Sequence, residues 1–395
     1  MRKRFLEVLA VVGMVLAVIV LLRVAPARSA STAQGLKTAW GDPDLQGIWT
    51  DDYQTPLQRP AKYANKAEFT DEERAELDRQ RASILRRNQR VEVGTERDVA
   101  GAYNAVFQSI KHTGKRTSLI VDPPDGRIPP LTSEAKQRAD TDRQFRLALL
   151  QATETCQNGD AACAGGKYGP PSPRRKEMPP FYNTGRLNRS DGPEDRSMTE
   201  RCMAAVLPDF GGYRRIVQGP GTVSIFYDVG QGQGWQRMIP VTSRPHVPSH
   251  VRQWWGDSRG HWEGQTLVVD VTNFSAKTDY LGSRENLHLV ERWTRLDSDT
   301  LEYAVTIEDG TTWTKPWTVK QELARQNDRA NRIYYEPRCH EGNYGLTGVL
   351  SGARAVERAY AQGKGPHPAA VDIFSAGPTF FAEDDIDPLA GGGAQ

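Results

Sequence analysis

One carboxylate is unusual because of the residues around it. The segment 287–296 alternates apolar and polar residues, and Leu289, Glu291 and Trp293 fall on one face. Successive side chains of a strand point to opposite faces, so this alternation predicts that Glu291 points inward. A buried carboxylate is costly unless it is paired, hydrogen-bonded or protonated, and Arg252 or a histidine is the expected partner. Glu291 is then either a general acid or base in a pocket or one half of a structural ion pair.

The segment 244–260 carries the densest cluster of polar side chains in the chain. Its candidates for chemistry are His246, His250, Arg252 and Asp257. Two imidazoles beside a cation and a carboxylate can form an acid–base pair or supply two metal ligands, but Pro248 argues against a shared helical face and the spacing assigns no metal. The alternative is a structural loop between strands, in which Asp257 shapes a hairpin and Trp254 packs.

Two further groups complete the expected pocket. Asn273 follows an apolar stripe on one face of the segment 262–274, so it is expected near the mouth of the pocket. His340 and Glu341 follow the last alternating run, where they either complete the pocket or cap the next helix.

These residues favour acid–base chemistry without a cofactor. The sequence contains no Walker loop, GxGxxG after a strand, HExxH or haem CxxCH motif, so no cofactor is expected. The predicted catalytic residues are His246, His250, Glu291 and His340, and the predicted substrate-binding residues are Arg252, Asp257, Asn273, Trp254 and Glu341. We expect a lyase, isomerase or hydrolase. The alternatives are a non-catalytic binding protein for a hydrophobic or aromatic small molecule and a structural envelope protein.

Short alternating runs after Arg201 must position these residues. Seven runs are bounded by Gly, Asp and Asn clusters: 213–228, 235–242, 262–274, 287–296, 299–308, 312–323 and 332–338. Because most connections are short and no long helix interrupts the runs, we predict a mainly β protein, an antiparallel barrel or sandwich with a lipocalin-like meander. The β domain spans 201–361, including a helix from about Gly348 to Ala361, and 362–395 is a tail.

The residues before the β domain are expected to form a strap, defined here as residues 30–200. Its first part, 30–69, is extended, and the region from Cys156 to 200 is an irregular loop. Capping-box patterns predict two charged helices, from Thr70 to about Arg87 and from Thr132 to about Thr153.

The first 29 residues are predicted to be a secretory signal. A basic start precedes an apolar run of about 15 residues, shorter than the roughly 20 needed to span a bilayer, so stable membrane insertion is not expected after cleavage. Cleavage would remove five basic residues and one acidic residue, which takes the formal charge from +2 to about −2. A chain with this near-neutral net charge is not expected to bind nucleic acid. The expected partner is a small-molecule ligand or substrate. The expected location is the periplasm or the medium.

Four cysteines suit that oxidising location. They are Cys156, Cys163, Cys202 and Cys339, and an even number in an exported chain predicts disulfides. Three pairings are possible. A local Cys156–Cys163 bridge across a short polar loop would leave Cys202 for Cys339, and no CxxC or close Cys/His spacing supports a metal instead.

Four short segments of the sequence resemble those of a protein family. In the segments 43–50, 122–129, 255–264 and 339–344, which read PDLQGIWT, DPPDGRIP, WGDSRGHWEG and CHEGNY, the chain resembles a family of uncharacterised exported bacterial proteins. The resemblance spans most of the mature chain. It implies export but transfers no catalytic residue, and the likeness of the β domain to lipocalins concerns the fold alone.

Overall fold

A single antiparallel sheet dominates the computed structural model, which describes residues 36–84, 111–150, 177, 207–211, 213–230, 233–326 and 344–364. Ten strands form this sheet, in the order β7-β6-β5-β1-β12-β11-β10-β9-β8, with β4 also on β12. The bounds are β1 Gly47–Thr50, β4 Ile120–Asp122, β5 Tyr213–Gly219, β6 Thr222–Gly230, β7 Gln233–Pro240, β8 Asp257–Glu263, β9 Thr266–Thr272, β10 His288–Arg295, β11 Thr300–Glu308 and β12 Trp317–Arg325. The predicted mainly β, antiparallel architecture is confirmed.

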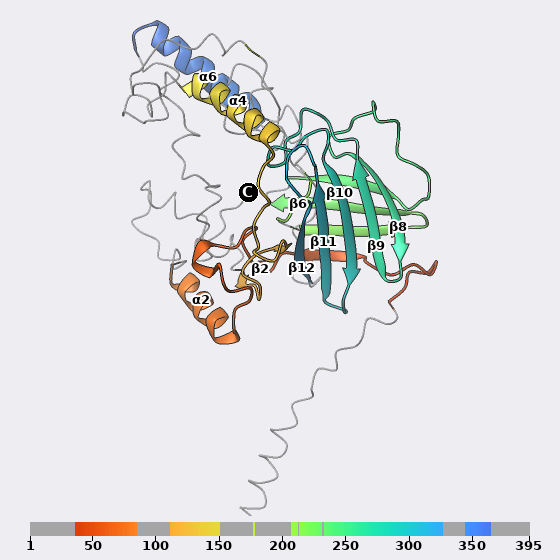
Figure 1. The fold of residues 1–395 in the computed structure, drawn as a ribbon. Coiled ribbons are helices and arrows are strands. Elements are labelled where there is room, and N and C mark those ends of the chain that lie inside the picture. The colour runs from red at the N-terminus through yellow and green to blue at the C-terminus, as the bar shows by residue number, and fades with distance from the viewer. Residues whose placement is uncertain are drawn as a thin grey trace, which may run out of the picture.

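The sheet curls until its two ends almost meet. In Figure 1, β5–β7 pass behind β8–β12 and run across them at a steep angle. The end strands β7 and β8 approach each other at a parallel bridge between Val241 and Gly260, and the Thr242 amide donates to the Gly260 carbonyl at 2.9 Å. A Cβ added at Gly260 would lie 3.1 Å from Ile239, so glycine permits the close approach. The result is a nearly closed barrel with a seam between β7 and β8.

Tight turns set most of the register. The run predicted over 213–228 is in fact two strands, β5 and β6, because Gly221 adopts a φ of +70° and turns the chain back. Similarly, Gly264 with a φ of +62° separates β8 from β9, whereas the sequence predicts one run over 262–274. The run predicted at 332–338 lies outside the described residues.

The strap contributes strands to the barrel. β1 lies between β5 and β12 and is antiparallel to both, and it places Trp49 in the core with no exposed surface. β4 pairs with the other end of the same β12 edge, at Thr318 and Val319. The extended first part of the strap is therefore a structural element of the sheet as well as a covering.

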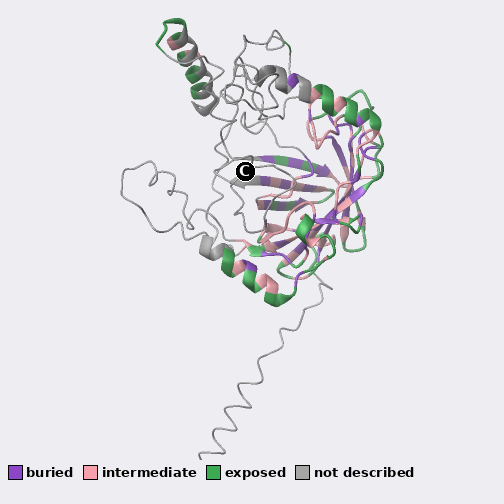
Figure 2. Ribbon diagram, turned by 60° about the vertical axis from the view of Figure 1, so that its left-hand side comes forward, coloured by how far each residue is buried: buried purple, intermediate pink, exposed green. Residues whose placement is uncertain are grey.

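Alternation produces a core rich in aromatic rings. The inward faces bury Trp49, Trp293, Trp313, Trp317, Tyr227, Tyr303 and Phe274 almost completely. Figure 2 shows the corresponding buried bands alternating along the strands. Burial of this apolar surface supplies the main favourable free energy of folding.

Among the described residues, three α-helices, one 3-10 helix and a small parallel sheet lie outside the barrel. They are α2 Asp71–Ile84, α4 Ser133–Leu150, α6 Tyr344–Ala361, the 3-10 helix η1 Ala61–Tyr63, and β2 Tyr53–Gln54 beside β3 His112–Thr113. The capping box is present, because the Thr70 amide donates to Glu73 at 2.8 Å and the Glu73 amide donates to Thr70 at 3.3 Å. The Thr132 hydroxyl caps α4 through the Ala135 amide. None of the described helices is long and apolar enough to cross a membrane.

Candidate functional site

Glu291 lies inside the barrel as predicted, and its side chain has no exposed surface. Its partners differ from those expected. Oε2 lies 2.7 Å from Nη1 of Arg237, an ion-pair contact outside hydrogen-bonding geometry, and Oε1 accepts a hydrogen bond of 2.7 Å from the Tyr303 hydroxyl. The prediction of Arg252 as the partner is wrong: Arg252 is exposed and donates to the Glu285 carbonyl.

Arg237 connects this carboxylate to two other strands. Its Nε and Nη2 donate to the Ser258 hydroxyl at 3.0 and 2.9 Å, and Nη1 donates to Tyr227 at 3.2 Å. Burial disfavours the charged guanidinium, but the charge of Glu291 outweighs it and the pKa of Arg237 is raised. Arg237 therefore stays a cation inside the barrel.

The two tyrosines of this network stay neutral. Burial, and then the negative charge of Glu291, raise the pKa of Tyr303 well above its ordinary value. Burial likewise raises the pKa of Tyr227, whose ring lies 4.6 Å from the guanidinium of Arg214. The network made of Glu291, Arg237, Ser258, Tyr227 and Tyr303, called here the inner network, can hold charge and donate hydrogen bonds.

A second polar chain crosses the outside of the barrel, over the strands β8 to β11. Its members, called here the outer chain, are Asp257, His246, Asp270, His288 and Glu308. The successive contacts between their side chains measure 2.8, 2.8, 3.0 and 3.0 Å. Arg259 pairs with Asp257 at its end, 3.0 Å away.

Both imidazoles of the outer chain contact a carboxylate through each nitrogen. Carboxylates only accept hydrogen bonds, so His288 satisfies Asp270 and Glu308 together when both its nitrogens carry a proton. Burial lowers the pKa of His288, but its hydrogen bonds to the two carboxylates outweigh burial and raise it. Neither His246 nor His288 keeps a nitrogen for a substrate. Among the described residues no cluster of three or more His, Cys, Asp or Glu has the geometry to hold a metal ion.

The other predicted site residues that the structure describes make separate local contacts. His250 is exposed, and Trp254 is half-buried. Asn273, at a φ of +60°, donates to the carbonyls of Val247 and Pro248 and so holds the loop that carries His246. Asp257 begins β8, where the sequence predicts a loop. His340, Glu341 and the four cysteines lie outside the described residues, as does the predicted signal.

A cleft opens where the β12 edge has no partner strand. β4 covers Thr318 and Val319 and β1 covers Ala324 and Arg325, while Gln321 lies between them and lines a cavity of about 200 Å³. The remaining lining residues come from β12, the strap and α2: Glu322, Asp51, Tyr53, Thr55, Arg74, Gly114, Lys115, Arg116 and Leu119.

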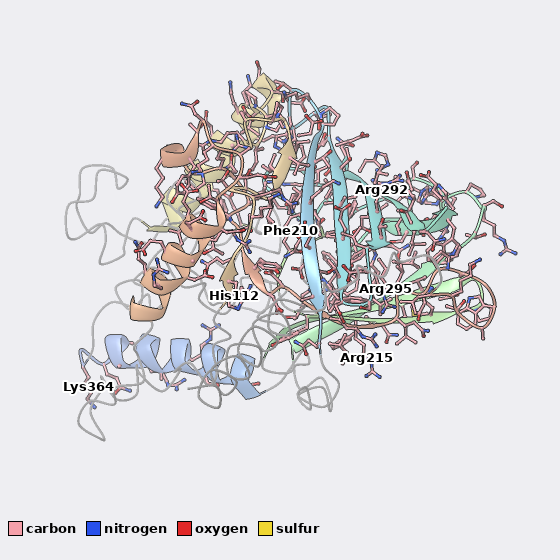
Figure 3. All side chains as sticks on the ribbon, turned by 90° about the horizontal axis from the view of Figure 1, so that it is seen from below. His112, Phe210, Arg215, Arg292, Arg295 and Lys364 are labelled. Atoms are coloured by element: carbon pink, nitrogen blue, oxygen red, sulfur yellow. The ribbon has the colours of Figure 1, made fainter. Side chains whose placement is uncertain are left out.

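Two buried polar atoms at this cleft have no protein partner among the described residues. Gln321 is 3% exposed, and its amide nitrogen donates to the Phe210 carbonyl at 2.6 Å, but its Oε1 accepts nothing. Figure 3 labels Phe210 beside the strands β11 and β12. Arg116 uses Nη1 and Nη2 on Glu322 and the Lys320 carbonyl, whereas its buried Nε is unpaired. A buried polar atom without a partner costs free energy, so both atoms favour a bound molecule.

The cleft also adjoins the inner network. Gln321 pairs directly with Tyr303 across β12 and β11, and both side chains are buried. Tyr303 in turn donates to Glu291. Two residues, Gln321 and Tyr303, therefore separate a molecule in the cleft from Glu291.

Sequence reasoning missed Arg237 although a signal was available. Trp235, Arg237 and Ile239 share one face of β7, which is the same pattern of a charge between apolar residues that identified Glu291. Gln321 carries the same signal, because it falls between Val319 and Leu323 on the buried face of β12. No comparable signal marks Arg116, Asp270 or His288, because their environments depend on strands and loops distant in sequence.

Comparison with known proteins adds no assignment. The chain matches no protein-family model and no curated protein. The resemblance to exported bacterial proteins accordingly stays a prediction.

Proposed function

We propose that the protein binds a small polar molecule in the cleft beside β12. The observation that carries this proposal is the unpaired Oε1 of Gln321, a buried amide oxygen on a residue that lines the cavity. Proteins seldom leave such an acceptor unsatisfied, and a ligand donor would satisfy it. The sequence predicts a hydrophobic or aromatic ligand, whereas the polar lining favours a polar one. With the predicted export signal, binding would take place in the periplasm or outside the cell.

A cofactor-independent acid–base enzyme is the second candidate. Its support is that Tyr303, which donates to Glu291, lies opposite Gln321 in the register of β11 and β12. We rank it second because both oxygens of Glu291 already contact protein groups, and because both imidazoles of the outer chain are fully engaged.

A ligand screen tests the proposed binding. The full-length protein is mixed with a library of small polar molecules, and binding is detected by saturation-transfer NMR. Gln321→Leu should abolish the signal of the true ligand, whereas Gln236→Leu, the same change at an exposed position of β7, should leave it intact. Hits that persist in Gln321→Leu, or no hits at all, would overturn the proposal. Incubation of each hit with the protein, followed by product analysis, tests for turnover and so decides between the two candidates.

A further inference from the structure

The charges around the cleft are balanced. Arg116 pairs with Glu322 at 3.2 Å, Lys115 with Glu68 at 3.2 Å, Arg74 with Asp71 at 3.2 Å, and Asp51 with Lys111 at 2.7 Å. A ligand with a net charge would have to disrupt one of these pairs or remain unpaired, and an unpaired charge in a partly buried site is costly. The lining therefore favours a ligand without net charge.

Of the two unpaired polar atoms at the cleft, one is a hydrogen-bond acceptor and the other is a donor. Oε1 of Gln321 requires a donor, and the Nε–H of Arg116 requires an acceptor. A hydroxyl group donates and accepts, so a ligand that carries several hydroxyls satisfies both atoms without bringing charge. Thr55, at the same cleft, offers a further hydroxyl.

Size and wall composition restrict the ligand further. A cavity of about 200 Å³ accommodates one small ring and excludes an oligosaccharide. Tyr53 and Leu119 give the wall an apolar portion, which suits the C–H face of a ring whose hydroxyls point outward.

We infer that the ligand is a neutral, polyhydroxylated ring of single-sugar size. This inference rests on the proposed binding function and adds the chemical class of the ligand. Gln321 and Arg116 bind its hydroxyls, and the ion pairs around the cleft select against charged analogues.

Four matched probes test the class: glucose, myo-inositol, glucuronate and glucosamine, titrated into the full-length protein by isothermal titration calorimetry. Direct titration is needed because polyols raise the unfolding temperature of proteins without binding. The neutral rings should bind at least about tenfold more tightly than the acid and the amine, the effect of roughly one lost polar interaction.

A variant that changes the charge but not the shape of the side chain at position 321 gives a second test of the ligand class. Gln321→Glu keeps the shape of the side chain and an acceptor for a hydroxyl, and it adds a negative charge, so relative to glucose it should weaken glucuronate and strengthen glucosamine. A purely structural defect would weaken all four probes together. Gln236→Glu, on the outer face of β7, should leave the four affinities unchanged.

The outcomes separate the two proposals. Tightest binding of glucuronate or glucosamine, lost in Gln321→Leu, would overturn the neutral class and leave the cleft as a binding site. Binding of glucose that ignores both Gln321 variants would overturn the inference and the site. If none of the four probes binds while the library yields a ligand dependent on Gln321, only the ligand class is wrong.

Discussion

Arg237 and Glu291 meet inside the barrel with 2.7 Å between Nη1 and Oε2, although their strands β7 and β10 are not neighbours in the sheet. The contact spans the interior next to the seam between β7 and β8, where few backbone bridges join the strands. Because Arg237 also binds Ser258 on β8, one guanidinium connects the two sides of the seam. A buried pair of this kind adds little net stability compared with an apolar pair, but losing one member is costly.

The first prediction compares the loss of one member of this ion pair with the replacement of both members. Glu291→Gln should lower the free energy of unfolding by roughly 3–5 kcal/mol, because it leaves the Arg237 charge buried without a counterion. The double variant Arg237→Met with Glu291→Leu should lose much less than the sum of the two single changes. Urea unfolding followed by tryptophan fluorescence measures the free energies of Glu291→Gln, of the double variant and of its two component single variants, Arg237→Met and Glu291→Leu.

A neighbouring arginine provides the control. Arg292, labelled in Figure 3, is half-exposed and pairs with Glu263 on the outer face. Arg292→Gln should leave the unfolding free energy nearly unchanged, as is usual for an exposed ion pair. Additive losses in the double variant would show that Arg237 and Glu291 do not act as a pair.

The second prediction is a pH dependence that originates in the outer chain. The folded protein raises the pKa of His288, so folding favours its protonated form. The stabilisation is complete below the unfolded pKa of about 6.5, and it is lost as the pH rises through the higher folded pKa. The groups that face His288 are Asp270 and Glu308, and the rest of the chain continues through His246 to Asp257 and Arg259.

His288→Gln isolates this contribution. As the pH rises from about 6.5 through the raised folded pKa of His288, the unfolding free energy of the unmodified protein should fall relative to that of His288→Gln, and the two curves should run parallel above that folded pKa. His261→Gln serves as the control, because His261 is exposed and contacts only the exposed Glu263 among the described residues. Parallel curves throughout would refute a protonated His288 in the folded state.

Local patterns predicted the elements better than their contacts. The alternation at Leu289, Glu291 and Trp293 correctly placed Glu291 inward, and the Thr70 capping box correctly marked the start of α2. Both features depend on residues close in sequence. The partner of Glu291 comes from β7, more than 50 residues away, and a sequence pattern sets faces but does not set which faces oppose each other.

The strand β1 illustrates a second limit. It has only four residues, in a region with little periodicity, and its pairing with β5 and β12 is set by the gap that those strands leave. The cleft has the same origin, since it exists where β1 and β4 both leave the β12 edge uncovered. A site produced by missing strand pairing leaves no motif in the sequence.

The third prediction compares two glycines with positive φ. Gly256 has a φ of +67° and precedes β8, and a Cβ there would lie 2.4 Å from the Thr272 carbonyl oxygen. Gly264 has a φ of +62°, but a Cβ there would meet nothing within 4 Å. Gly264→Ala should cost about 1–2 kcal/mol of unfolding free energy from backbone strain alone.

Gly256→Ala should cost clearly more than Gly264→Ala, because the clash is with backbone and cannot be relieved by a side-chain rotation. The added loss should appear as faster hydrogen exchange in β8 and β9, which adjoin the displaced residue. Equal losses for the two variants, measured by urea unfolding, would show that the loop before β8 adapts freely.

The last prediction tests whether the strap is part of the barrel. Trp49 in β1 is fully buried, donates through Nε1 to the Leu45 carbonyl at 2.9 Å, and lies 5.3 Å from the guanidinium of Arg295. Trp49→Ala should cost about 3–5 kcal/mol, the usual loss for a large aromatic side chain removed from a core. Trp40→Ala, in the same segment but 39% exposed, should cost far less. Because β1 is hydrogen-bonded on both edges, the Trp49 variant should expose the amides of β5 and β12 to exchange together, whereas a strap that merely covered the sheet would leave both strands protected.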